Sequence, residues 1–164
     1  MKKKSVIEDK MIVLTEFQKE HSRENIERVF VSGNDVLLSQ YTHQKIFGKY
    51  VKQLSQHPSK RLIVKITHNK NSIYRIWRGA IGIPSKNIVY IDKVGKKFLL
   101  NNEDYYENDG KTNKEFDITL SKGSLFMYYY NHFDNATRIS FKFGFFSIIL
   151  SLISIALTVP SFFI

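Results

Sequence analysis

Cysteine is absent from the 164 residues of the chain. Its absence excludes disulfides and thiol chemistry, and it is typical of a protein in a reducing compartment. The chain also lacks the patterns that mark common catalytic sites: its five histidines have no metal-ligand spacing, and no nucleophile elbow surrounds a serine. We therefore expect no enzyme activity, no metal ion and no cofactor.

The sequence also lacks the pattern of a secretory leader, and we expect none. Residues 1–4 contain three lysines, like the basic start of a leader, but Glu8 and Asp9 follow where its apolar core should be. We therefore expect the N-terminal part of the chain to stay in the cytosol, and membrane insertion to begin from the C-terminus.

Charge is missing from residues 143–164, which are largely apolar. A helix needs roughly 20 such residues to cross a bilayer. The sequence thus predicts a C-terminal transmembrane helix over residues 141–164 and one compact cytosolic domain over residues 1–140. Arg138 and Lys142 flank the apolar run, so the positive-inside rule predicts a single-pass protein of the inner or plasma membrane with its N-terminal domain in the cytosol.

Small and hydroxylated residues recur along this run at alternating steps of four and three, the a and d spacing of a heptad. They share one helix face, whose close packing and hydrogen bonds favour helix association in lipid, so we expect a homo-oligomer. In the oligomer, this face either lines a narrow water-filled pore or packs against other helices without water. Alternatively, a serine in a single membrane helix can donate its hydroxyl hydrogen bond to the backbone of the same helix. We call this face the hydroxyl seam: Ser140, Gly144, Ser147, Ser151, Ser154, Thr158 and Ser161.

Positive charge is concentrated in residues 61–100, which hold nine Lys or Arg and one acidic residue, Asp92. The segment has a net charge of +8, against +10 for the whole chain. Its β-branched runs predict sheet, with aromatic residues interleaved among cations. Cations attract phosphates and aromatic faces stack on bases, so we expect a DNA oligomer, other single-stranded nucleic acid or a nucleotide as ligand. The predicted ligand-binding residues are Arg61, Lys65, Lys70, Tyr74, Arg75, Trp77, Arg78, Lys93, Lys96 and Lys97.

Two other interpretations of the basic segment stay open. A basic surface close to a membrane is attracted to anionic lipid headgroups. Alternatively, the aromatic rings belong to the core and the cations form an ordinary solvated surface.

The predicted fold class is α+β, with a β-rich, barrel-like or strongly twisted antiparallel sheet and one or two N-terminal helices, followed by the transmembrane helix. The clearest soluble helix is predicted over residues 34–54, and residues 22–30 have a weakly helical start. Residues 101–110 are expected to form an acidic loop. Strands are predicted over residues 11–17, 61–67, 72–78, 87–92, 97–100, 116–121, 124–130 and 137–143.

Two functions fit these features. In the first, the chain is a homo-oligomeric membrane effector whose pore is gated by an anionic ligand on the basic domain. In the second, it is a membrane-tethered module that binds nucleic acid or anionic lipid and conducts nothing. An apolar anchor without the hydroxyl seam would support the second function equally well but would abolish the first.

The arrangement resembles the small membrane effectors of bacterial antiphage defence, and most closely the membrane effector of the Hailong system. The resemblance rests on chain size, on the basic segment 61–97, and on the face that carries Ser151, Ser154 and Thr158. It implies a homotetrameric channel whose electropositive interior binds an inhibitory DNA oligomer made by a partner nucleotidyltransferase. Loss of that oligomer would open the channel and depolarise the cell. A cyclic nucleotide, or an activating ligand, is an open alternative.

Overall fold

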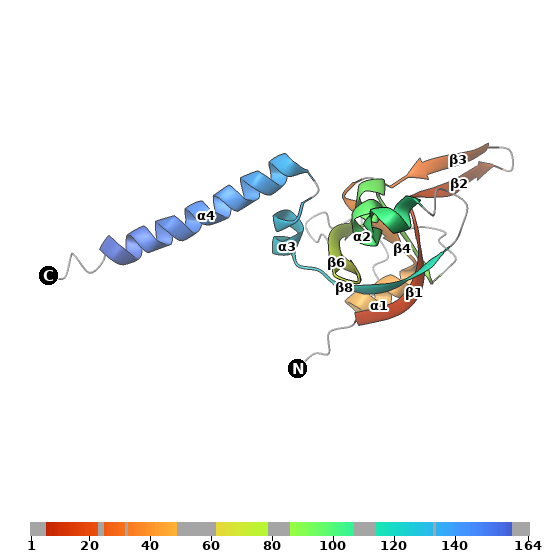
Figure 1. The fold of residues 1–164 in the computed structure, drawn as a ribbon, viewed down its shortest axis with the longest axis horizontal. Coiled ribbons are helices and arrows are strands. Elements are labelled where there is room, and N and C mark those ends of the chain that lie inside the picture. The colour runs from red at the N-terminus through yellow and green to blue at the C-terminus, as the bar shows by residue number, and fades with distance from the viewer. Residues whose placement is uncertain are drawn as a thin grey trace. The chain divides into compact units, whose positions relative to one another are not determined.

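The computed structural model describes residues 6–22, 25–31, 33–48, 62–78, 86–106, 114–132 and 134–158. The chain divides into two compact units, Met1–Tyr128 and Tyr129–Ile164. In the first unit, six strands close a barrel in the order β1-β7-β4-β6-β5-β8 (Figure 1). These strands are β1 (Val6–Leu14), β4 (Asp35–Leu38), β5 (Ile63–His68), β6 (Asn71–Trp77), β7 (Ile88–Ile91) and β8 (Glu115–Lys122).

The predicted α+β class with a barrel-like sheet is confirmed. The sheet is mixed, however, because β1 pairs with β7 and β4 pairs with β6 in parallel. The other four neighbouring pairs are antiparallel. Among its described residues, this unit also contains a two-stranded hairpin and three helices, the last of which ends in the second unit. These elements are β2 (Glu16–Ser22), β3 (Asn25–Phe30), α1 (Gln40–Phe47), α2 (Lys93–Tyr106, broken at Asn101) and α3 (Leu125–Tyr130).

The barrel interior is the hydrophobic core. Because alternate residues of a strand share one face, Val36 and Leu38 of β4 and Val89 and Ile91 of β7 all lie inside and are fully buried. The longer strands contribute further aliphatic residues and Trp77 to the same cluster. A core of this kind supplies most of the stability of a small domain.

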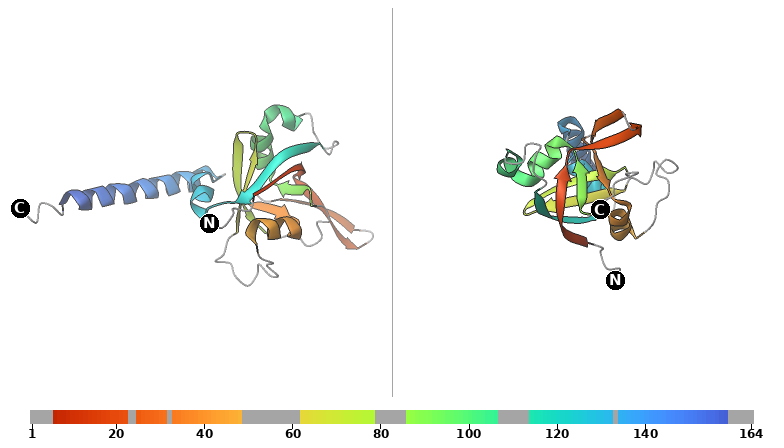
Figure 2. Two further views of the ribbon diagram at one scale, coloured as in Figure 1. Left: turned by 90° about the horizontal axis from the view of Figure 1, so that it is seen from below. Right: turned by 90° about the vertical axis from the view of Figure 1, so that its right-hand side faces the viewer.

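The barrel consists of two topologically equivalent halves. The first contains β1, β4, α1 and β5, and the second contains β6, β7, α2 and β8. The short strands β4 and β7 pair with each other around Leu37 and Tyr90. The last strands of the two halves, β5 and β8, pair around Thr67 and Thr119. α1 packs on β1 and β8, whereas α2 packs on β6 and β5. Figure 2 shows the two helices on opposite sides of the barrel.

The strand registers make Val36 equivalent to Val89, an offset of 53 residues. The same offset relates the first residues of α1 and α2, Gln40 and Lys93, and the positive-φ residues Gly48 and Asn101, so it extends from Asn34 to Gly48. The repeat is not evident in the sequence, because few equivalent residues are identical. Identity is limited to scattered pairs such as Asn34 with Asn87.

Helix caps explain three segments that were predicted as strands but are helical. Ser124, Asp92 and Asp134 each accept a hydrogen bond from the backbone amide three residues later. This geometry starts a helix even where β-branched and aromatic residues favour a strand. Residues 97–100 therefore lie in α2, residues 125–130 form α3, and residues 137–143 belong to α4 (Asn135–Thr158).

The helix predicted over residues 34–54 was too long. Its first part is β4, because Val36 and Leu38 alternate into the core, and Ser39 caps α1 only afterwards. Gly48 ends α1 with a φ of 68°, and residues 49–54 lie outside the described residues. Residues 25–30, given a weakly helical start, form β3. Residues 101–106 of the predicted acidic loop belong to α2, and the rest of that loop lies outside the described part of the chain.

The second unit contains α4, a helix of 24 residues that is long and apolar enough to cross a membrane. At 1.5 Å per residue it is about 36 Å long. None of its residues is buried. It begins earlier than the span predicted from residue 141, because Asp134 caps its first turn.

Candidate anion-binding surfaces and membrane helix

Three of the residues predicted to contact a ligand lie inside the first unit. Tyr74, Arg75 and Trp77 of β6 are 8%, 4% and 4% exposed, and burial raises the pKa of the Tyr74 hydroxyl. The rings of Tyr74 and Trp77 therefore present little surface on which a base could stack. Arg78, which follows β6, is exposed, and its Nε donates to Asp35 Oδ1 at 2.9 Å.

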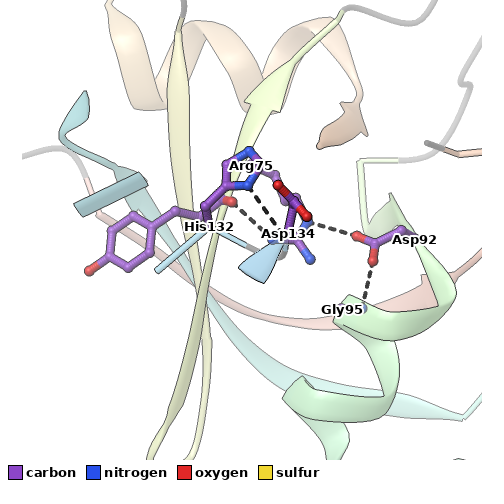
Figure 3. A network of polar contacts seen from close by, with 6 residues as sticks. Arg75, Asp92, Gly95, His132 and Asp134 are labelled. Carbon is purple, nitrogen blue, oxygen red and sulfur yellow. Dashed lines mark hydrogen bonds and ion pairs between the residues drawn. The ribbon is translucent and has the colours of Figure 1, made fainter. Parts of the chain in front are cut away.

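Arg75 takes part in a buried ion pair that fixes the start of α2 (Figure 3). Its Nε donates to Asp92 Oδ1 at 2.7 Å, and its Nη1 donates to the carbonyl oxygen of Tyr74 at 3.0 Å. The other carboxylate oxygen of Asp92 accepts from the Gly95 amide at 2.7 Å. A Cβ at residue 95 would lie 2.7 Å from Arg75 Nη2, so the site favours glycine. Arg75 thus holds the first turn of α2 and presents little charge to solvent.

Lysines gather instead on and beside α2. Lys93 and Lys97 are exposed, while Lys96 is half-buried and its pKa is lowered by that burial. The Asn71 side chain donates to the carbonyl oxygen of Phe98 at 3.0 Å and so holds the β5–β6 turn, with its exposed Lys70, against α2. We call Lys70, Lys93, Lys96 and Lys97 the α2 surface.

Besides Arg75 and Arg78, two further predicted cations do not belong to the α2 surface as the structure describes it. Lys65 is half-buried on β5, opposite Tyr74 in the strand register. Arg61 lies outside the described residues. The structure therefore gathers four of the ten predicted ligand-binding residues on the α2 surface and leaves three buried in β6.

A second cationic cluster, missed by the sequence analysis, lies at α1. The Nζ atoms of Lys45 and Lys86 are 4.9 Å and 4.3 Å from the centre of the exposed Tyr41 ring. Hydrogen bonding to Lys45 and the charges of both lysines lower the pKa of the Tyr41 hydroxyl. The spacing of four between Tyr41 and Lys45 in one helix was the available signal. We call these three residues the α1 surface.

His43 and Trp77 form an unusual buried pair. Their rings stack with centroids 3.6 Å apart, and His43 is fully buried. Among the described residues, both ring nitrogens of His43 and Nε1 of Trp77 have no hydrogen-bond partner. Burial lowers the pKa of His43 to about 4, so its imidazole is neutral at physiological pH and acts as a core aromatic group.

The hydroxyl seam of α4 has a defined hydrogen-bond pattern. Ser147 donates to the carbonyl oxygen of Phe143 and Ser151 to that of Ser147, both at 2.9 Å, and Thr158 donates to that of Ser154 at 3.0 Å. An added Cβ at Gly144 would meet no atom within 4 Å. The donated protons are thus satisfied inside the helix, while each oxygen keeps acceptor capacity. Ser161 lies outside the described residues.

Within the described ranges, no group of three or more His, Asp or Glu side chains is placed to hold a metal ion. Comparison of the chain with known protein families finds no match, and a search of curated proteins finds none either. Among solved structures, the chain is similar to a computationally designed protein, msDPBB_sym2. The two share 15% sequence identity over 71% of this chain and all of the designed one, with a TM-score of 0.38.

Proposed function

We propose that the chain is a self-associating membrane effector with a ligand-controlled ion pathway. α4 crosses the inner or plasma membrane, several copies join along the hydroxyl seam, and the N-terminal barrel binds an anionic oligonucleotide or nucleotide in the cytosol. The observation that carries this proposal is the seam itself. It gives one ordered face to a helix of 24 residues that has no buried residue of its own.

Helix association in lipid supports this role for the seam. Lipid tails are as apolar as leucine, so membrane helices associate through close packing at small residues and through hydrogen bonds. The open space at Gly144 allows the backbone of a second helix to approach closely. The oxygens of Ser147 and Ser151 keep acceptor capacity on the same face, which suits either a neighbouring helix or a hydrated cation.

The α2 surface supports an anionic ligand. Lys93 and Lys97 are exposed, and burial lowers the pKa of Lys96 beside them. In a symmetric oligomer, each copy adds such a surface, and like charges repel unless a polyanion neutralises them. A ligand of this kind controls conduction only if it binds the open and closed assemblies with different affinity.

A tethered binding module is the second candidate. It is favoured by the back-bonded hydroxyls of Ser147, Ser151 and Thr158, whose protons need no partner outside their own helix. In that case α4 only anchors the barrel, and any apolar helix of similar length would replace it.

The membrane potential of cells that produce the full chain separates the two candidates. We expect depolarisation and growth arrest, the outcome expected of an antiphage effector, and loss of both in Ser154→Leu, which adds bulk to the seam. Ala156→Leu is the matched control, since it adds bulk on the opposite face and should still depolarise. Equal depolarisation by both variants, or by a chain with an unrelated anchor, contradicts the pore.

Binding of a short single-stranded DNA to the full chain in detergent tests the ligand. Replacing Lys93 and Lys97 by Glu should weaken binding and lower the dependence of log affinity on log salt by about 0.7 for each phosphate that the protein no longer neutralises. The pair Lys45→Glu and Lys86→Glu, on the α1 surface, is the matched control for net charge. Equal effects of the two pairs would mean that the DNA responds to overall charge.

A further inference from the structure

The short helix α3, just before the candidate membrane helix, exposes large apolar side chains. Leu125 is 52% exposed and Phe126 is 40% exposed, whereas Tyr128 is buried. Tyr129 and Tyr130 are half-buried. Adjacent large apolar side chains that remain this exposed mark a surface that suits an apolar partner better than water.

The end of α3 is held against the start of α4 by aromatic contacts. The Tyr129 ring stacks on Phe141, with centroids 5.6 Å apart, and on His132, with centroids 6.3 Å apart. Lys142 Nζ lies 4.4 Å from the centre of the Tyr130 ring. These contacts join the last turn of α3 to the second turn of α4.

The connection between the two helices is also hydrogen-bonded. Asp134 N donates to His132 Nδ1 at 3.2 Å (Figure 3). Asp134 Oδ2 accepts from the backbone amide and hydroxyl of Thr137 at 2.9 Å and 2.7 Å. The Thr137 hydrogen bonds lower the pKa of the Asp134 carboxyl. The cap is therefore charged at neutral pH, where an acidic group favours the N-terminus of a helix.

We propose that α3 and the first two turns of α4 form an interfacial anchor that lies among the lipid headgroups of the cytosolic leaflet. Leu125 and Phe126 dip toward the acyl chains, Tyr129 and Tyr130 lie at headgroup level, and Lys142 reaches lipid phosphate. The proposal rests on the proposed function in one respect, since it requires α4 to enter the membrane.

Three observations favour a lipid surface as the occupant. Tyrosine has an apolar ring and a polar hydroxyl, so it concentrates at membrane interfaces. Lysine extends its aliphatic stem along apolar groups while its ammonium group remains at the headgroups. Finally, the exposed residues are continuous along the chain with α4, because α3 ends at Tyr130 and α4 begins at Asn135.

Depth-dependent fluorescence quenching tests the anchor in the full chain. Because the chain has no cysteine, single variants Phe126→Cys, Leu150→Cys and Gln44→Cys each accept one fluorescent label. The labelled chains are placed in vesicles of phosphatidylcholine and phosphatidylglycerol that carry a nitroxide either near the top or near the end of the acyl chain. We expect the shallow nitroxide to quench the label at 126, the deep nitroxide to quench the label at 150, and neither to quench the label at 44.

The outcomes separate the anchor from the membrane helix. If the label at 150 is quenched and the label at 126 is not, α3 faces water or a second copy of the chain, and the anchor is wrong while the membrane helix stands. If the label at 150 is not quenched, α4 does not enter the bilayer, and the proposed function fails together with the anchor.

A charge variant tests the role assigned to Lys142. Combined with the label at 126, Lys142→Glu should lose shallow quenching in anionic vesicles, because its carboxylate is repelled by lipid phosphate. Lys142→Arg is the matched control and should retain the quenching. Equal quenching in both variants contradicts the contact with phosphate, and the label at 150 checks that each variant is inserted.

Discussion

The two halves of the barrel solve the same structural problem with different chemistry. In the first half, the position before α1 is Ser39, and its equivalent in the second half is Asp92. Each side chain caps its helix at the third amide that follows. The strand registers make Met11 equivalent to Arg75, and both are buried. An apolar side chain and a hydroxyl thus stand where the other half has a buried ion pair.

The difference shows that the barrel needs a helix cap and a buried side chain that fills the space at these positions, whereas the residue type at each position can differ. His43 and Lys96 are also equivalent, yet one is a neutral ring stacked on Trp77 and the other a half-buried cation. The second half carries the ionic groups at its buried positions and the lysines on its helix. Some of its charged residues therefore stabilise the fold and others form a surface, and substitutions at each set can separate the two roles.

The largest expected effect comes from breaking the buried ion pair. Asp92→Ala leaves Arg75 buried without a counter-charge and removes the cap of α2, so we expect the free energy of unfolding to fall by about 3–5 kcal/mol. Urea unfolding of the full chain in detergent, followed by the fluorescence of Trp77, the single tryptophan, measures it. Arg75→Met with Asp92→Ser copies the first half and should restore most of the stability. If the double variant has no higher free energy of unfolding than Asp92→Ala, the second half cannot use the residues of the first half at these positions.

The next effect is a pH dependence that belongs to the first half. The pKa of His43 is about 4 in the folded chain, against 6.5 ordinarily, so the unfolded chain binds more protons between these values. Above about pH 6.5, His43 is neutral in both states and does not change the free energy of unfolding. As the pH falls from 6.5 to 4, protonation of His43 in the unfolded chain lowers that free energy by about 3 kcal/mol. Urea unfolding at a series of pH values measures this loss. His43→Leu should lack this loss, and a loss unchanged in that variant would contradict the assignment.

A smaller effect is expected at the first turn of α2. Gly95 is equivalent to Thr42, but a Cβ at residue 95 would lie 2.7 Å from Arg75 Nη2 and 2.8 Å from Asp92 Oδ1. We expect Gly95→Ala to lower the free energy of unfolding by about 1–3 kcal/mol, despite the better helix propensity of alanine. In the background of Arg75→Met with Asp92→Ser, the same change should be tolerated, and urea unfolding compares the two. An equal loss in both backgrounds would place the strain elsewhere.

Composition and alternation predicted the fold class, the barrel-like sheet and the C-terminal apolar helix, because these depend on patterns that span many residues. Single capping side chains decided the rest. Asp92 and Asp134 start helices in segments whose local composition favours strands. For Trp77 the sequence left two interpretations open, a ligand contact or a core ring, since strand alternation does not say which residues of a basic strand face the core, and the structure places it in the core.

The smallest expected effect compares the end of α1 with the break inside α2. Gly48 and Asn101 are equivalent, with φ of 68° and 62°, but Asn101 has a ψ of 156°. That combination is almost restricted to glycine and costs other residues about 1–3 kcal/mol. Replacing Asn101 by glycine relieves the strain, but it also frees the unfolded chain, so we expect a gain of about 1 kcal/mol. The gain would appear as a higher urea midpoint at constant slope. Gly48→Asn should lower the midpoint slightly, because asparagine tolerates the left-handed region. A lower midpoint for Asn101→Gly would instead mean that the asparagine side chain stabilises the bend in α2.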